Sequence, residues 1–161
     1  LNLEKMLDTN HKHIMRTGHE ELAGLVAPFL GRLGTPVPAD HPRLVGACRT
    51  RREKAKTLVQ LAEEIRFYFL ADDAIEYEPK AVKKFLGDDA RARLGELAGA
   101  LEAVDPWDEG ELGFGKVAAP SRVALVGGKD GPGIWEAMAV LGKESTLARL
   151  RRAAAYDGEA R

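Results

Sequence analysis

The chain has 161 residues, of which 45% are hydrophobic and 30% are charged, a composition typical of one ordinary folded domain or two small ones. Its 24 Lys and Arg residues almost balance its 25 Asp and Glu residues, and the net charge of -1 excludes a nucleic-acid binder that acts through a global positive field. The single cysteine, Cys48, excludes an intramolecular disulfide framework and a multi-cysteine zinc site, and no apolar run approaches the roughly 20 residues needed to span a bilayer.

The first half of the chain predicts helices. Thr17-Gly-His-Glu20 has the Thr-x-x-Glu form of a capping box and predicts the start of a helix. Apolar residues follow it at helical spacing: Leu22, Leu25, Val26, Phe29, Leu30 and Leu33. Gly34-Thr-Pro-Val-Pro38 breaks this pattern. From Leu44 to Phe69 the apolar positions again recur near a period of 3.6, which predicts one long helix or two abutting helices.

The second half predicts shorter helices. The acidic, turn-like segment from Ala71 to Pro79 marks a boundary, and helical patterns follow over residues 80–86, 90–101, 134–141 and 144–155. Only Arg122-Val-Ala-Leu-Val126 has the pattern of a strand, and one strand makes no sheet. We therefore expect an all-α fold with two small helical subdomains, residues 17–76 and 77–161, after a linking segment of residues 1–16. Since the chain begins without Met on a segment that reads as mid-chain, we expect a piece of a longer polypeptide.

A basic segment lies within the predicted helix after Leu44. Arg49-Thr-Arg-Arg-Glu-Lys-Ala-Lys56 holds five cations, and on a helix Arg49, Arg52 and Lys56 would share one face beside the apolar stripe. Such a face either binds phosphates and bases or is a solvated helix surface. Composition alone leaves both interpretations open.

A glycine-rich segment in the second half is a further candidate for chemistry. Val123-Ala-Leu-Val-Gly-Gly-Lys-Asp-Gly-Pro-Gly133 places an apolar run before glycines that lead into a helix, a layout that can hold a phosphate. It lacks the Gly-Lys-Ser/Thr of a Walker loop and the room for a second strand, so nucleotide binding is only an alternative. The histidines, His11, His13, His19 and His41, form no metal pattern, and no catalytic triad is suggested by spacing.

Three segments together resemble the C-terminal half of bacterial glutamyl-tRNA synthetases. Leu3-Glu-Lys-Met6 with Asn10-His-Lys-His-Ile-Met-Arg16 is similar to the family's Phe-Asp-x-x-Lys-Leu…Asn-x-x-Tyr-Ile-Arg segment. Arg52-Glu-Lys-Ala-Lys-Thr-Leu58 through Asp73 is similar to its Arg-Glu-Arg-Ala-Lys-Thr-Leu…Phe-Phe-Phe helix. Gly115-Lys116, Pro120-Ser-Arg-Val-Ala-Leu-Val-Gly127, Pro132-Gly-Ile134 and Leu141-Gly-Lys143 match the family's end in order and spacing.

The resemblance implies two all-α subdomains that read the anticodon of tRNA(Glu), with residues 1–16 as the remnant of a stem-contacting segment. On this basis the residues expected to contact RNA are Arg49, Arg51, Arg52, Lys54, Lys56, Arg122, Pro132 and Ile134. Lys54 stands where the family usually has an anticodon-reading Arg, so we expect it to discriminate bases less sharply than a bidentate Arg.

Partners and cofactors follow from the same resemblance. The expected partners are tRNA(Glu), with tRNA(Gln) left open, and a catalytic domain of the same polypeptide, with no membrane and no DNA. No His-x-Gly-His element and no Lys-x-Ser-Lys loop is present in the sequence, so we expect no catalytic residues, no metal and no cofactor in this chain. ATP and magnesium would serve the catalytic domain of the resembled ligase. We expect a cytoplasmic location.

A second hypothesis is a stand-alone paralogue that uses the same helical scaffold for protein interaction or regulation. Ala119 replaces the family's usual Gln before the proline. The link from Trp107 to Gly115 is also about a dozen residues short, too little for the usual helix. Both departures favour reduced anticodon specificity on a conserved scaffold.

Overall fold

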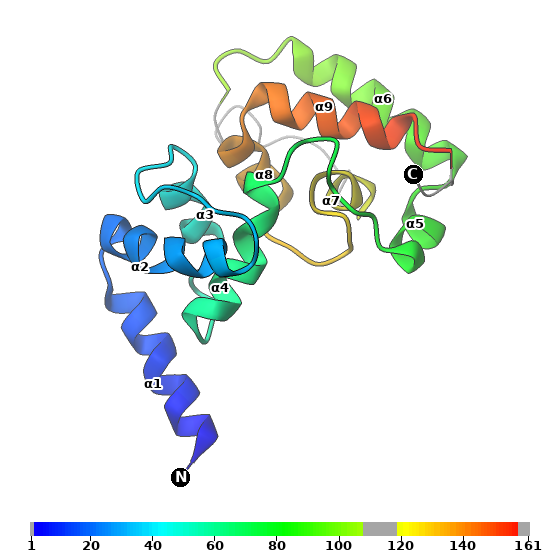
Figure 1. The fold of residues 1–161 in the computed structure, drawn as a ribbon. Coiled ribbons are helices and arrows are strands. Elements are labelled where there is room, and N and C mark those ends of the chain that lie inside the picture. The colour runs from blue at the N-terminus through cyan, green and yellow to red at the C-terminus, as the bar shows by residue number, and fades with distance from the viewer. Residues whose placement is uncertain (1, 108–118, 158–161) are drawn as a thin grey trace. The chain divides into compact units, whose positions relative to one another are not determined.

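The computed structural model describes residues 2–107 and 119–157. The chain divides into two compact units, Leu1–Leu70 and Ala71–Arg161, and helices build both (Figure 1). The predicted all-α class is confirmed, because no β-strand occurs within the two described ranges. We expected a subdomain boundary between residues 76 and 77, and the structure divides between Leu70 and Ala71. In the described part of the chain, no helix is long and apolar enough to cross a membrane.

The first unit contains four α-helices and a short 3-10 helix. They are α1 (Leu3–Arg16), α2 (His19–Arg32), α3 (Leu44–Arg51), α4 (Leu58–Ile65) and the 3-10 helix η1 (Arg66–Phe69). Helix α2 packs against both α3 and α4. The core between them is made of fully buried apolar side chains, among them Leu22, Val26, Leu30, Leu44, Leu61, Ile65 and Tyr68.

Helix α1 was not predicted as a helix. It buries only Ile14, and most of its length extends away from α2, α3 and α4 (Figure 1). The capping box expected at Thr17 is wrong. The Thr17 hydroxyl, at the end of α1, donates instead to the carbonyl of His13 at a distance of 2.6 Å. Helix α2 begins at His19, after Gly18, with no side-chain cap. The Thr17 hydroxyl therefore binds a carbonyl at the end of α1 and does not accept a hydrogen bond from a free N–H at the start of α2.

The predicted run of helix from Leu44 to Phe69 is interrupted. Helix α3 ends at Arg51, and α4 begins at Leu58 after a non-helical turn of residues 52–57. Thr57 starts the second helix, because its side chain accepts a hydrogen bond from the backbone N–H of Gln60 at 3.0 Å. We call residues 52–57 the lysine turn, after Lys54 and Lys56.

The second unit contains α5 (Pro79–Phe85), α6 (Asp88–Glu102), α7 (Ala119–Val126), α8 (Ile134–Leu141) and α9 (Lys143–Ala154). Helix α9 packs along α6 and also contacts α7 and α8. Its core includes the buried side chains of Leu94, Ala98, Leu125, Met138 and Leu150. The four helices predicted for this half are confirmed within two residues at each end. The strand considered for residues 122–126 is wrong, because these residues form most of α7.

Candidate nucleic-acid interface

The lysine turn has a fixed backbone. The N–H groups of Lys54 and Ala55 both donate to the carbonyl of Arg51 at 3.1 Å. The carbonyl of Ala55 accepts a hydrogen bond from Nδ1 of His11, on α1, at 2.8 Å. The N–H of Lys56 donates to the side-chain oxygen of Gln60 at 2.8 Å. The turn is therefore bonded to α3 before it, to α4 after it and to α1 beside it.

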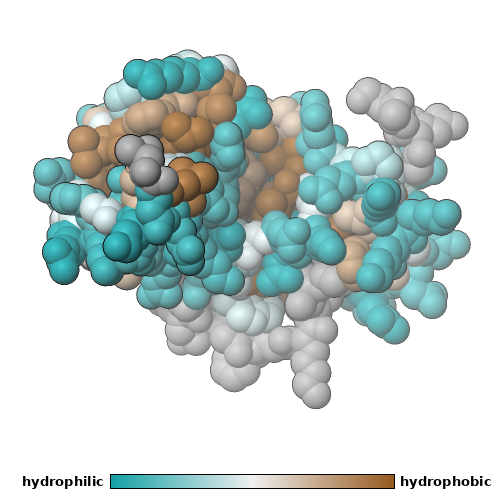
Figure 2. All heavy atoms as spheres, turned by 90° about the horizontal axis from the view of Figure 1, so that it is seen from below, coloured by the Kyte–Doolittle hydropathy of each residue, from teal (hydrophilic) through white to brown (hydrophobic). Residues whose placement is uncertain are grey.

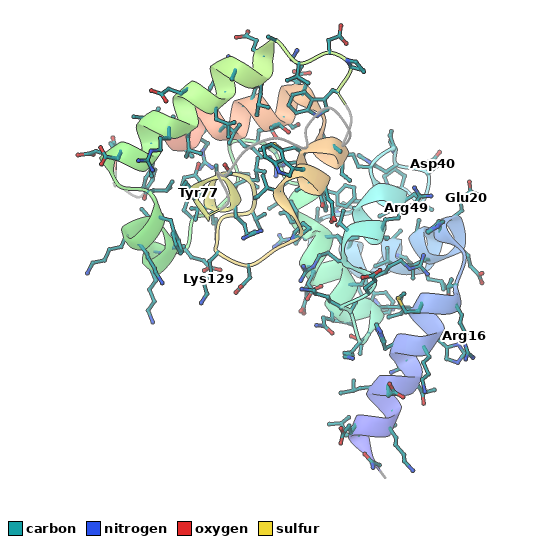
Figure 3. All side chains as sticks on the ribbon, turned by 180° about the vertical axis from the view of Figure 1, so that it is seen from behind. Arg16, Glu20, Asp40, Arg49, Tyr77 and Lys129 are labelled. Carbon is teal, nitrogen blue, oxygen red and sulfur yellow. The ribbon has the colours of Figure 1, made fainter. Side chains whose placement is uncertain are left out.

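Three cations of the basic segment reach solvent. Arg49 on α3 (Figure 3), Lys54 and Lys56 are all exposed. Arg51 is mostly buried, and its Nε lies 3.1 Å from Oε2 of Glu64 on α4. The expected cluster is thus reduced to three accessible positive charges, with a fourth partly neutralised by Glu64.

Arg52 lies inside the first unit. Its side chain is 6% exposed. It donates hydrogen bonds to the carbonyls of Ile14 and Thr17, and a third one to Nδ1 of His19 at a distance of 3.0 Å. The prediction of a single helix face for Arg49, Arg52 and Lys56 is wrong, because the helix ends at Arg51, and Arg52 is buried whereas the other two residues are exposed. In this conformation the guanidinium of Arg52 is occupied by the protein.

In the second unit, Arg122 lies on α7 with its side chain half-buried. Its Nε is buried and has no hydrogen-bond partner among residues 2–107 and 119–157. Arg only donates, so within those ranges this nitrogen is left without an acceptor. Pro132 is buried and Ile134 is 7% exposed, so both pack within the unit rather than on its surface.

The glycine-rich segment after α7 has a structural explanation. Gly127 has φ +100°, and a Cβ there would overlap the backbone oxygen of Glu76. The carbonyl of Gly127 accepts from the N–H of Glu78 at 2.7 Å, so the backbone at residues 76–78 comes very close to this turn. The glycines thus permit a close approach of two chain segments. The phosphate-loop alternative loses its basis, because it needs a strand where α7 stands.

Sequence reasoning singled out neither Lys129 nor His11 as a candidate site residue. Lys129, exposed in the loop after α7, extends away from the helices (Figure 3). Its setting in Gly-Gly-Lys-Asp-Gly is typical of an exposed turn, so this signal was present in the sequence. His11 carries no comparable signal, because its bonding partner Ala55 lies 44 residues away along the chain.

The first unit also has an apolar hollow of about 340 Å³, lined mainly by Ile14, Leu22, Leu25, Phe29 and Leu58. Leu25 and Val59 at this site are each 45% exposed, and hydrophobic surface is visible between hydrophilic residues in Figure 2. No carboxylate is among its described lining residues, and its polar lining consists of Asn10, His13, Thr17 and Thr57.

The described ranges hold no assembled metal site and no reactive cysteine. No group of three or more His, Cys, Asp or Glu side chains there is placed to hold a metal ion. Cys48 is 1% exposed, and burial raises the pKa of its thiol to about 12, so it is not a nucleophile at neutral pH. The motif residues Gly115 and Lys116 and the shortened link before them lie outside the described residues, and Ala119 is the first residue of α7.

The family model and the similar proteins point to the same family. The family model of the anticodon binding domain matches residues 21–154. The glutamate–tRNA ligase of Anaeromyxobacter dehalogenans strain 2CP-C is 37% identical over 171 residues, covering 98% of this chain and 35% of the ligase. The glutamate–tRNA ligase of Syntrophobacter fumaroxidans is 39% identical over 166 residues, covering 94% of this chain and 35% of that ligase. The chain thus spans about a third of the length of these relatives.

A solved structure has the same fold. The crystal structure of a glutamate tRNA ligase from Elizabethkingia meningosepticum matches with a TM-score of 0.79 at 22% identity, covering 95% of this chain and 32% of that one. At that identity the match is evidence for the fold alone.

Proposed function

This chain belongs to the anticodon-binding domain family and is homologous to the C-terminal region of glutamate–tRNA ligases, and on that premise we propose that it binds the anticodon arm of tRNA(Glu). In an intact ligase this binding would hold the tRNA while a separate catalytic domain, with ATP and magnesium, charges it. The chain itself would need no cofactor. A role in translation also leads us to propose a cytoplasmic location.

The observation that carries the proposal is the lysine turn. Lys54 and Lys56 are exposed on a backbone that is bonded on three sides, with exposed Arg49 close before them in sequence. Single-stranded RNA loops are bound by cations that contact phosphates and by side chains that reach base edges. We assign phosphate contacts to Arg49 and Lys56, with a smaller share for Arg51, and a base contact to Lys54.

The second unit would contribute Arg122. Its stem is packed, its Nε is buried without an acceptor in the described part of the chain, and its side chain is still partly exposed. These features suit a cation that donates a hydrogen bond to one RNA oxygen in a defined direction. Arg52, Pro132 and Ile134 are buried, so we propose that they support the interface from inside rather than touch RNA.

A net charge of -1 means that any attraction for RNA is local. Binding should therefore depend on a small number of cations, and each lost phosphate contact should reduce the slope of log affinity against log salt by about 0.7–0.9. This gives a direct count of the contacts that the lysine turn makes.

The test measures tRNA(Glu) binding at roughly 50 and 200 mM salt for the wild type and the double variant Lys54→Ala/Lys56→Ala. The matched control is Lys80→Ala/Lys83→Ala, which removes two exposed lysines from α5 and changes the net charge equally. We expect the lysine-turn variant to bind at least about tenfold more weakly with a flatter salt slope, and the control to bind like the wild type. No wild-type binding at low salt, or equal losses in both variants, would overturn the proposal.

A further inference from the structure

We propose that Arg52 and His11 are positioning residues that hold the lysine turn in its RNA-binding conformation before RNA arrives. This inference rests on the proposed function and concerns residues that would not themselves touch RNA. It gives Arg52 a different role from the direct contact that its sequence motif suggested.

Arg52 anchors the start of the turn. Its side chain is 6% exposed, and its donors reach two carbonyls near the end of α1, at Ile14 and Thr17, and the ring of His19 at the start of α2. Arg is permanently charged and its donors form a rigid fork, so one side chain can join these segments at once. The turn therefore begins at a residue that is fixed to the junction between α1 and α2.

His11 anchors the middle of the turn. Its Nδ1 donates to the carbonyl of Ala55 at 2.8 Å, and Ala55 is itself fully buried. Lys54 lies between two buried residues, Arg52 and Ala55, with exposed Glu53 before it. Lys56 follows directly and is held by the bond from its N–H to Gln60. The two exposed lysines are thus framed by anchored neighbours.

Such anchoring matters because a mobile loop must lose conformational freedom when it binds. A turn that is already ordered avoids this entropic cost, which strengthens binding without any added contact. Helices α3 and α4 close only the two ends of the turn, whereas Arg52 and His11 bond it sideways to α1 and the start of α2.

Two other roles for Arg52 make different predictions. A direct phosphate contact would need the guanidinium to leave Ile14, Thr17 and His19, and its removal would lower the salt slope. A purely structural role would change the stability of the fold and leave the affinity of the folded protein unchanged.

The experiment uses the full chain and a tRNA(Glu) transcript, with variants kept well below their unfolding midpoints. His11→Ala removes the bond to Ala55, and Arg52→Lys keeps the charge but loses the fork. The matched control is His13→Ala, an exposed histidine on the same helix. Hydrogen exchange of the amides of residues 53–57 reports the order of the turn without RNA.

We expect His11→Ala and Arg52→Lys to bind about fivefold or more weakly, with the salt slope unchanged and faster exchange in the turn. In a cycle with Lys54→Ala, the effect of His11→Ala should shrink, because the positioned group is gone. The control should bind like the wild type.

Wild-type affinity in His11→Ala would overturn the inference even if Arg52→Lys fails to fold. A further variant, Arg52→Gln, removes the charge. If it reduces the slope of log affinity against log salt by about one, Arg52 contacts phosphate directly and the inference is overturned. Absence of binding by the wild type would instead remove the proposed function and this inference with it, so the two failures are distinguishable.

Discussion

Arg149 donates from its Nε to Oδ1 of Asp72 across 2.8 Å, although the two residues are 77 positions apart in the chain. The Arg149 side chain is completely buried, and its Nη1 also donates to the carbonyl of Leu125 at 2.9 Å. Helix α9 is thereby joined to the last turn of α7 and to the segment that opens the second unit. This arginine holds in place the helix that carries Arg122.

Replacing Arg149 with Met should destabilise the second unit by about 2–4 kcal/mol, because it leaves the carbonyl of Leu125 and the carboxylate of Asp72 without their donor. Asp72 is one-third exposed, and rehydration keeps the loss below the upper limit for buried pairs. The measurement is urea unfolding followed by circular dichroism. Arg151→Met, which breaks the exposed pair with Glu102, should cost no more than about 0.5 kcal/mol, and an equal cost would contradict the assignment.

Gly127→Ala should cost about 2 kcal/mol or more, because it combines a positive φ with overlap against the backbone of Glu76. Gly99→Ala is the control, since Gly99 lies in α6 with open space around it and alanine favours helix by about 0.5–1 kcal/mol. Thermal melts of the two variants should move in opposite directions. A harmless Gly127→Ala would show that the turn is not held against residues 76–78.

Cys48 should be almost inert to thiol reagents in the folded protein. Burial raises its thiol pKa from 9.0 to about 12, so the folded state binds this proton more tightly than the unfolded state. Stability linked to Cys48 is therefore complete below about pH 9 and is lost as the pH rises toward 12. Labelling with a disulfide reagent near about pH 8 should follow global unfolding in urea. Rapid stoichiometric labelling without denaturant would contradict the burial.

Lys54→Arg should sharpen discrimination between tRNA(Glu) and an anticodon-swapped transcript by about three- to tenfold, since an Arg fork can contact a base edge at two points where Lys contacts it at one. Lys83→Arg on α5 is the matched control. Equal affinity gains for both transcripts would indicate that position 54 contacts only phosphate.

Much of the helical architecture could be predicted from the sequence, because apolar periodicity records which face is buried. Helix α8 was predicted at its observed residues, Ile134–Leu141. The run 122–126 was considered as a strand because a short apolar segment has too few residues to show its period, and its helical state depends on packing against α9. Helix α1 was missed although Leu3, Leu7 and Ile14 recur at helical spacing, because polar and charged residues fill most of its other positions.

The candidate site was predicted less well than the fold. Exposed positions such as Arg49 and Lys54 follow from charge, but nothing local distinguishes them from Arg52, which has the same chemistry and is buried. Its burial depends on carbonyls 35 and 38 residues earlier in the chain. Pro132 was expected at an RNA-facing turn and is buried for a similar reason, since tertiary packing decides which side of a turn faces solvent.

The central claim is that this chain reads an anticodon. A titration of the full chain with labelled tRNA(Glu), and with the same transcript carrying a different anticodon, tests it most directly. We predict that tRNA(Glu) binds at least about tenfold more tightly at roughly 100 mM salt. Equal affinity for the two transcripts, or no binding to either at low salt, would contradict the account.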